Sequence, residues 1–224
     1  NSTSAVSAIT FVDANVVPSN SGVVSDIKIL ADGKDGWAAI GGKIYKSIDI
    51  QNGNWNEVTN IGGVGTRAQI GTSSLDAAGG YYTYISFTSA LGCLAGIFKS
   101  VDKGATWSQI AFAGGLDPFA QPTGAANTGC QGWYDHCIAV NPIDKDKIYI
   151  GGITFYTWGA GSGGLKRADQ IDSEGSSVLD PNYIHADKHF IIFDQHDPTG
   201  NTMYVTGDGG INKCANANSG FPDN

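Results

Sequence analysis

The side chains best suited to chemistry lie in two short stretches of the chain. The first, GWYDH, covers residues 132–136, and the second, YIHADKH, covers residues 183–189. Together they hold three of the four histidines, and an acidic loop at Asp208 follows soon after the second stretch. Imidazole and carboxylate groups can bind a metal ion, transfer protons or hydrogen-bond a polar ligand. These stretches are therefore the first places to look for function.

The spacing within the second stretch raises the question of a metal site. In an extended chain His185, Asp187 and His189 would project from one face, because side chains alternate with a period of two. Positions two apart on a strand are about 6.6 Å apart and positions four apart about 13 Å, whereas metal–ligand bonds are about 2 Å long. A divalent-metal site of these three residues therefore requires a bend in the chain, or completion by Asp135 or Asp208.

Two other interpretations of the same side chains remain open. They could form hydrogen bonds that hold the inner strands of the fold, or they could form a polar glycan-binding or acid/base cluster. Glycoside cleavage uses paired carboxylates about 5 to 9 Å apart, and the candidate catalytic carboxylates are Asp135, Asp187 and Asp208. The candidate ligand-binding residues are Trp133, Tyr134, His136, His185 and His189. The two aromatic rings of the first stretch would stack on a sugar or pack within the fold.

Composition and charge narrow the class of partner. The net charge is -8 and the chain has only two arginines, Arg67 and Arg167, so no basic stripe is available for phosphate groups. We therefore expect no nucleic acid and no anionic membrane surface as partner. No apolar run reaches the ~18 residues of a membrane span, so no membrane insertion is expected. The 32 glycines and the low share of charged residues, 15% against about 25% in average domains, indicate tight turns and β structure.

An internal repeat organises the chain. A short apolar strand with a basic residue at its third position recurs as IYKSID, IFKSVD, LKRADQ and INKCAN, which begin at residues 44, 97, 165 and 211. The intervals are 53, 68 and 46 residues, which suits units of several strands each. A second match aligns residues 138–141 with residues 191–194 and makes His136 and His189 equivalent.

The repeat predicts an all-β fold. Within a unit, short β-branched and aromatic runs are separated by Gly, Asp, Asn and Pro. Four strands per unit around a shared axis predict a β-propeller whose first strands line the axis. We expect blades near residues 25–58, 67–112, 133–169 and 185–224, with residues 8–12 as an outer strand of a preceding or closing blade. This strand would close a four-bladed ring or, as we favour, the chain is part of a larger propeller and contacts its remaining blades.

The four cysteines predict export, because disulfides persist in oxidising compartments. Their spacing does not fit the paired C-x-x-C pattern of a zinc site. Cys93 and Cys130 fall in predicted loops of adjacent blades at the same end of the fold and are the expected disulfide pair. Cys137 lies within a predicted inner strand and is expected to be a buried free thiol.

One short motif resembles a known signature turn. Residues 99–110 read KSVDKGATWSQI and are similar to the Asp-box of sialidase-like and sortilin-like propellers. An Asp side chain binds backbone N–H groups inside a turn, Gly takes a positive φ, and Trp packs between sheets. The resemblance implies a structural turn between the third and fourth strands of a blade, away from the ligand face. The matching residues are Ser100, Asp102, Gly104, Thr106 and Trp107, with Ser47, Asp49, Gly53 and Trp55 as a looser second copy.

Residues 130–214 resemble consecutive blades of large secreted Asp-box (BNR-repeat) propellers of bacteria, many described as glycosyl-hydrolase-like surface proteins. Xyloglucanase-type hydrolases share the blade pattern. The resemblance implies a secreted or cell-surface protein that binds or hydrolyses a polysaccharide or glycan. If it is an enzyme, it would be a glycoside hydrolase with paired carboxylates and not a sialidase, which would need three arginines on the sugar carboxylate. The alternative is a non-catalytic module that contacts another surface protein.

Overall fold

The computed structural model describes residues 22–122, 129–169 and 179–218. In these ranges the chain forms four antiparallel β-sheets, three with four strands and one with three, and a single 3-10 turn, η1 (Ile50–Asn52). The predicted outer strand at residues 8–12 lies outside the described residues. Among the residues that the structure describes, no helix is long and apolar enough to cross a membrane.

Each sheet is a meander in which consecutive strands pair side by side. The first comprises β1 (Val24–Ile29), β2 (Gly36–Ile40), β3 (Lys43–Ser47) and β4 (Asn56–Glu57). The second comprises β5 (Arg67–Thr72), β6 (Thr83–Thr88), β7 (Leu94–Ser100) and β8 (Ser108–Phe112). The third comprises β9 (Cys137–Val140), β10 (Lys147–Gly151), β11 (Phe155–Gly159) and β12 (Lys166–Arg167). The fourth comprises β13 (Lys188–Phe193), β14 (Met203–Gly207) and β15 (Gly210–Cys214).

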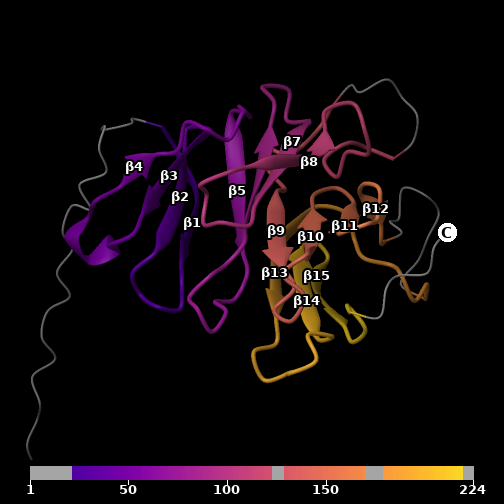
Figure 1. Cartoon of the computed structure of the whole chain (residues 1–224). Helices are drawn as coiled ribbons and strands as arrows, with labels where there is room; N and C mark the ends of the chain where they lie inside the picture. Colours follow the sequence, from indigo (N-terminus) through magenta and orange to yellow (C-terminus); the bar gives the residue numbers. More distant parts are fainter. Residues whose placement is uncertain (1–21, 123–128, 170–178, 219–224) are drawn as a thin grey trace, which may run out of the picture.

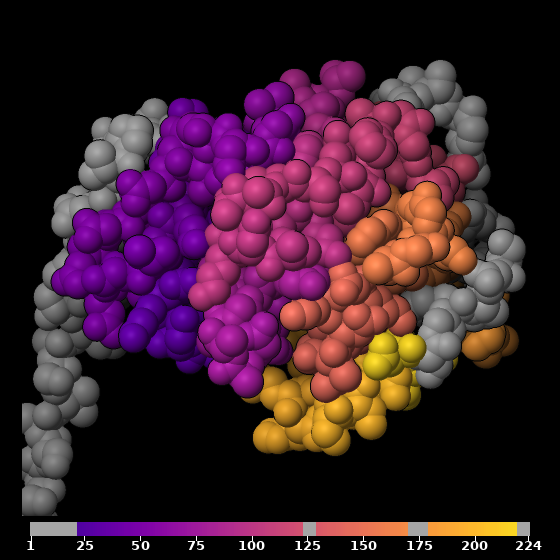
Figure 2. Space-filling model, in the orientation of Figure 1, coloured from indigo at the N-terminus to yellow at the C-terminus, as the bar shows by residue number. Residues whose placement is uncertain are grey.

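The four sheets are arranged as the blades of a propeller (Figure 1). The first strand of each sheet lies innermost, because β1 contacts β5, β5 contacts β9, and β9 contacts β13. Figure 2 shows the blades following one another across the surface in chain order, from indigo to yellow. The prediction of an all-β propeller is therefore confirmed.

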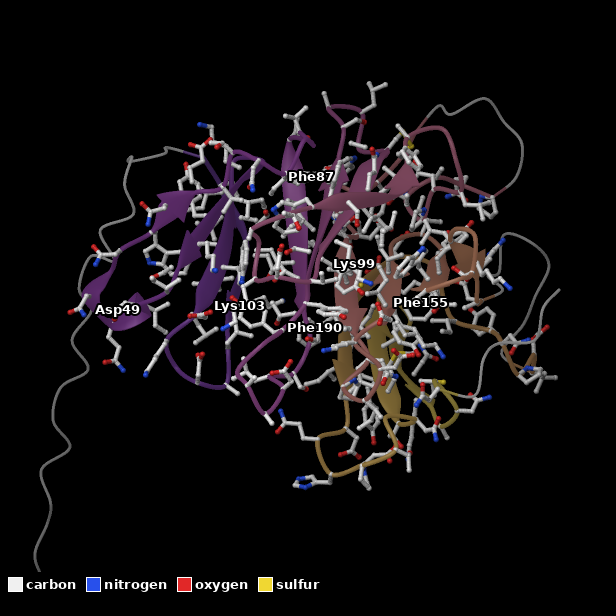
Figure 3. The ribbon with its side chains drawn as sticks, viewed as in Figure 1. Asp49, Phe87, Lys99, Lys103, Phe155 and Phe190 are labelled. Atoms are coloured by element: carbon white, nitrogen blue, oxygen red, sulfur yellow. A yellow bond between two sulfur atoms is a disulfide. The ribbon has the colours of Figure 1, made fainter. Side chains whose placement is uncertain are left out.

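The inner strand β9 is covered on both faces because it lies between two neighbouring blades. In β9, Ile138 and Val140 belong to the core between the second and third blades, whereas Cys137 belongs to the core between the third and fourth. This division follows from the period of two along a strand. Phe87 belongs to the core between the first two blades (Figure 3). With both faces of β9 covered in this way, the polar side chains of residues 132–136 lie just before the strand begins.

The basic residue of the repeat lies over an aromatic ring in three of the four blades. Each lysine is on the third strand and its ring is directly opposite on the second. The distances from Nζ to the ring centroid are 5.4, 5.9 and 5.9 Å for Lys46 over Trp37, Lys99 over Tyr84 and Lys213 over Tyr204. In the third blade, however, Arg167 lies on the fourth strand, opposite Tyr156. The repeat match at Arg167 is displaced by one strand, since the third strand there, FYTWG, has no basic residue.

Lysine and tyrosine side chains also bind each blade to the one that follows. In each of three joints, a lysine or tyrosine of one blade donates a hydrogen bond to a backbone carbonyl in a turn of the next. The joints are Lys46 Nζ to Lys103 O at 2.7 Å, Tyr84 OH to Lys145 O at 2.7 Å, and Tyr149 OH to Ala217 O at 2.5 Å.

The turn between β7 and β8 is held by side-chain hydrogen bonds. Asp102 accepts from the Thr106 backbone N–H at 2.8 Å and from its hydroxyl at 2.6 Å, while Ser100 Oγ accepts from the Gly104 N–H at 2.7 Å. These bonds, those from Thr106 above all, lower the pKa of Asp102 to about 2. The corresponding turn of the first blade carries Asp49 at the outer edge of the molecule (Figure 3). These positions support the structural role expected for both turns.

Gly104→Ala should lower the free energy of unfolding by about 1–3 kcal/mol. Gly104 has a φ of 87°, and an added Cβ would lie 2.4 Å from Cη2 of Trp37 in the first blade. Urea denaturation measures the loss. Gly79→Ala is the matched control, because Gly79 has a φ of 74° but an added Cβ would meet nothing within 4 Å. Equal losses in the two variants would contradict a contribution from packing against Trp37.

Candidate functional site

The segments singled out in the sequence meet at one end of the inner strands. Residues 132–136 lead into β9, residues 183–187 lead into β13, and Asp208 lies in the turn between β14 and β15. The Asp208 backbone N–H donates to the Asp187 carbonyl at 3.2 Å, which joins the last two segments. The Tyr134 hydroxyl donates to the Asp208 carboxylate, which connects residues 132–136 to the other two segments.

An aromatic–acid cluster of Trp133, Tyr134, His189 and Asp208 lies on the surface at this end. The Tyr134 hydroxyl is 3.1 and 3.2 Å from the two carboxylate oxygens of Asp208, and His189 Nε2 is 2.8 Å from Oδ1. The ring centroids of Tyr134 and His189 are 4.7 Å apart, and those of Trp133 and Tyr134 are 5.9 Å apart. Trp133 is 65% exposed and Tyr134 is 43% exposed. The hydrogen bond from His189 lowers the pKa of Asp208, so its carboxylate stays ionised at neutral pH.

Two glycines allow the β14–β15 turn to approach the segment before β13. A Cβ added to Gly209 would lie 2.3 Å from the Cβ of His185, and one added to Gly207 would lie 2.5 Å from the carbonyl oxygen of Asp187. His185 therefore packs against the turn, with Nδ1 2.9 Å from the carbonyl oxygen of Ala186. This close contact fixes the position of the β14–β15 turn, and with it the position of the Asp208 carboxylate.

Asp135 and Asp187 lie next to the cluster, and the charge of Asp187 acts on the carboxyl group of Asp135. Asp135 has no exposed surface. Both of its carboxylate oxygens, and Oδ1 of Asp187, are buried without a hydrogen-bond partner among the described residues. Burial, followed by the charge of Asp187, raises the pKa of Asp135 to about 8. Asp187 has a φ of 63°, a left-handed conformation that Asp adopts more readily than most residues.

Two basic residues also contribute contacts at the site, and neither was predicted from the sequence. Lys188 is fully buried, and its Nζ donates to the Ile153 carbonyl at 2.7 Å and to the Asp169 carboxylate at 2.5 Å. Burial lowers the pKa of Lys188, and the charge of Asp169 opposes this. Arg67, at the start of β5, donates to the Trp133 carbonyl at 2.6 Å. A lysine opening an inner strand, where an apolar residue is expected, is the one sequence signal that could have identified the first contact.

His136 is a packing residue between the second and third blades. It is 2% exposed, its Nε2 lies 2.9 Å from Ser86 Oγ, and its ring centroid is 4.6 Å from that of Phe119. Burial, and then the positive charge of Arg67, lowers the pKa of His136 to about 3. The imidazole is therefore neutral at physiological pH.

Burial divides the predicted site residues into two groups. The exposed or partly exposed ones are Trp133, Tyr134, His185, Asp187, His189 and Asp208. The buried ones are Asp135 and His136, which do not reach the surface that a polysaccharide could touch.

The structure does not gather His185, Asp187 and His189 around one point as a set of three metal ligands. The described residues contain one group of three potential ligand atoms within 4.8 Å of one another, and it lies at the disulfide instead. His189 directs Nε2 to Asp208, which the sequence alone did not reveal.

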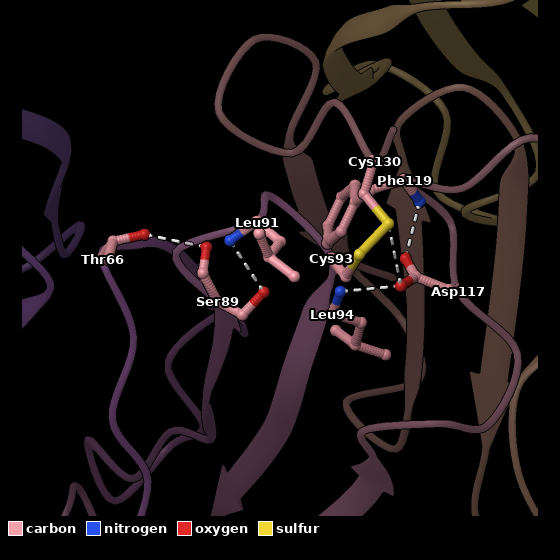
Figure 4. Close-up of a disulfide and its surroundings, with 8 residues drawn as sticks. All are labelled: Thr66, Ser89, Leu91, Cys93, Leu94, Asp117, Phe119 and Cys130. Atoms are coloured by element: carbon pink, nitrogen blue, oxygen red, sulfur yellow. Dashed lines mark hydrogen bonds between the residues drawn. A yellow bond between two sulfur atoms is a disulfide. The ribbon is translucent and has the colours of Figure 1, made fainter. Parts of the chain in front are cut away.

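Cys93 and Cys130 form a disulfide, as predicted (Figure 4). The bond joins the loop between β6 and β7 to the segment before β9. Beside it, Asp117 accepts a hydrogen bond from the Leu94 N–H at 2.8 Å. Cys137 is a buried free thiol, also as predicted. The disulfide holds two of the loops that surround the site, and it fits an extracellular protein.

Comparison with known proteins identifies the fold. No protein-family model and no curated protein matches the chain. A GH74 enzyme from Niastella koreensis superposes with a TM-score of 0.57 and 19% identity, over 91% of this chain and 30% of that chain. A putative TolB from Agrobacterium tumefaciens superposes with a TM-score of 0.50 and 13% identity, over 87% of this chain and 58% of that chain.

The chain therefore spans less than two thirds of either protein. At these identities the likeness concerns the fold, and the chain is a β-propeller with four blades in the described residues.

Asp135→Asn should remove a pH dependence of stability in protein kept free of metal by EDTA. The pKa of Asp135 is about 8 in the folded chain and about 3.9 when unfolded, so the folded state holds the proton more tightly. The stabilisation is complete below about pH 4 and is lost as the pH rises towards 8. Between these pH values the variant should gain about 1 kcal/mol or more relative to wild type. Urea denaturation at several pH values measures this, and parallel curves would contradict it.

Lys188→Met should lower the free energy of unfolding by about 3 kcal/mol, because it leaves the Asp169 carboxylate buried beside Arg167 alone. Adding Asp169→Asn should restore part of the loss, since the buried charge is then gone. Lys43→Met is the control, because Lys43 pairs with Glu57 on the surface and its loss should change little. A double variant no more stable than Lys188→Met would argue against the ion pair as the cause.

Proposed function

We propose that this chain is an extracellular or cell-surface propeller that binds carbohydrate through its aromatic–acid cluster. The observation that carries the proposal is the exposed pair of rings, Trp133 and Tyr134, beside the ionised carboxylate of Asp208. Sugars present C–H faces that stack on aromatic rings and hydroxyl groups that donate to carboxylates. The cluster offers both kinds of contact on one surface.

The geometry favours recognition over hydrolysis at this cluster. Cleavage by paired carboxylates needs two that reach the glycosidic bond, about 5 to 9 Å apart. Asp135 has no exposed surface, so it does not reach a bound sugar. Asp208 is accessible, but both of its oxygens accept hydrogen bonds from Tyr134 and His189. The GH74 enzyme from Niastella koreensis shares the fold, and hydrolysis remains an outcome of the test below.

The disulfide supports the proposed location, because such bonds persist in oxidising compartments. The alternative function is a non-catalytic module that contacts another surface protein through the same exposed rings. The two proposals differ in what binds the cluster, and a polysaccharide assay separates them.

Trp133→Ala should weaken polysaccharide binding at least about tenfold, which corresponds to the loss of one stacking contact of roughly 1.4 kcal/mol. Affinity electrophoresis and titration calorimetry with xyloglucan, mixed-linkage glucan and other soluble polysaccharides measure binding, and release of reducing sugars measures hydrolysis. Phe112→Ala is the matched control, because Phe112 is an exposed ring on β8 of the second blade. No binding to any polysaccharide, or the same loss in both variants, would overturn the proposal in favour of a protein partner.

A further inference from the structure

The carboxyl pair of Asp135 and Asp187 next to the cluster is not explained by carbohydrate binding. Asp135 comes from the segment before β9 and Asp187 from the segment before β13, so the pair spans two blades. Three of their oxygens, both of Asp135 and Oδ1 of Asp187, are buried without a hydrogen-bond partner among the described residues. Buried polar atoms are normally satisfied, and ionised carboxylates are the costliest to leave unpaired.

The donors around the pair are directed elsewhere. Lys188, the nearest buried cation along the chain, donates to Ile153 and Asp169. The Tyr134 hydroxyl and His189 Nε2 both point to Asp208. Ionised carboxylates only accept hydrogen bonds, so neither member of the pair can satisfy the other. Something positive must therefore lie between them.

Counting the oxygens distinguishes a proton from a metal ion. One shared proton makes a single O–H···O bond and satisfies two oxygens, which leaves the third buried oxygen without a partner. A metal ion can bind both oxygens of Asp135 together with Oδ1 of Asp187. The three atoms are thus better matched to a cation than to a proton.

We propose that Asp135 and Asp187 bind a calcium ion at the boundary between the third and fourth blades. Carboxylate oxygens suit hard cations, and calcium accepts a bidentate carboxylate and irregular geometry, whereas magnesium demands a near-ideal octahedron. Calcium takes about six to eight oxygens, so backbone carbonyls or water complete the shell. A soft or borderline ion such as zinc is disfavoured because the nearby His189 is bonded to Asp208.

The ion would tie the two loops that form the aromatic–acid cluster. Asp135 directly follows Tyr134 in the chain, and the Asp187 carbonyl accepts the backbone N–H of Asp208. The site therefore lies behind both halves of the surface cluster. It fixes loop positions, and it does not depend on what the cluster binds.

The test is calcium binding by the whole chain after dialysis against EDTA. Titration calorimetry should give one calcium ion per chain, and thermal unfolding should shift upward by about 3 °C or more once calcium exceeds its dissociation constant. Magnesium at the same concentration should give a smaller shift. Terbium, added alone as a luminescent calcium substitute, should be sensitised through the neighbouring Trp133.

Two variants report on the site itself. Asp135→Asn and Asp187→Asn should each weaken calcium binding at least about tenfold and lose the thermal shift. Asn tolerates the left-handed conformation of residue 187, so the second variant should also fold. Glu57→Gln is the control, because Glu57 is an acidic residue of β4 in the first blade, and its calcium response should match wild type.

Three results would overturn the proposal. The first is a wild-type protein without any calcium response, and stabilisation by Asp135→Asn in EDTA would then assign the pair to a shared proton. The second is a stoichiometry other than one. The third is a calcium response that survives in both asparagine variants. None of these outcomes depends on polysaccharide binding, so this site and the proposed function can fail separately.

Discussion

The structure depends on one packing constraint, that an inner strand between two blades is covered on both of its faces. β9 illustrates it, since alternate residues enter two different cores. A single sheet cannot meet this requirement alone, so each blade is stable only between neighbours. Most of the polar groups described above lie near the two ends of the strands. One end carries the structural turns such as that of Asp102, and the other carries the acids and histidines of the candidate site.

Charge is buried where the third and fourth blades meet. Lys188 and Asp169 form a desolvated ion pair, and the uncompensated carboxyl pair of Asp135 and Asp187 lies close by. Taking such groups out of water is costly unless each finds a partner of suitable geometry. The ion pair of Lys188 and Asp169 is complete within the chain, whereas the carboxyl pair of Asp135 and Asp187 calls for a positive ion. The surface cluster is connected to these groups, because the backbone N–H of Asp208 donates to the carbonyl of Asp187.

The fold could be predicted from the sequence because its signals are local. Strand length, turn residues and the recurrence of a basic residue indicate four-stranded units, although the match at Arg167 fell on the wrong strand. The end of the propeller that carries the site followed from the same reasoning. What could not be predicted is the direction of each side chain there. Asp135 and His136 are adjacent to exposed Tyr134 yet buried, and His189 turns to a carboxylate 19 residues away. Tertiary contacts decide these directions, and no period in the sequence encodes them.

Three of the joints between blades run in the same direction along the chain. A lysine or tyrosine of one blade holds a carbonyl of the blade that follows, at Lys46, Tyr84 and Tyr149 alike. The first three blades each supply a donor to the blade that follows, and the second, third and fourth each supply a carbonyl acceptor to the blade before. The second and third blades carry both, so removing either one would leave a donor on one side and a carbonyl on the other without their partners.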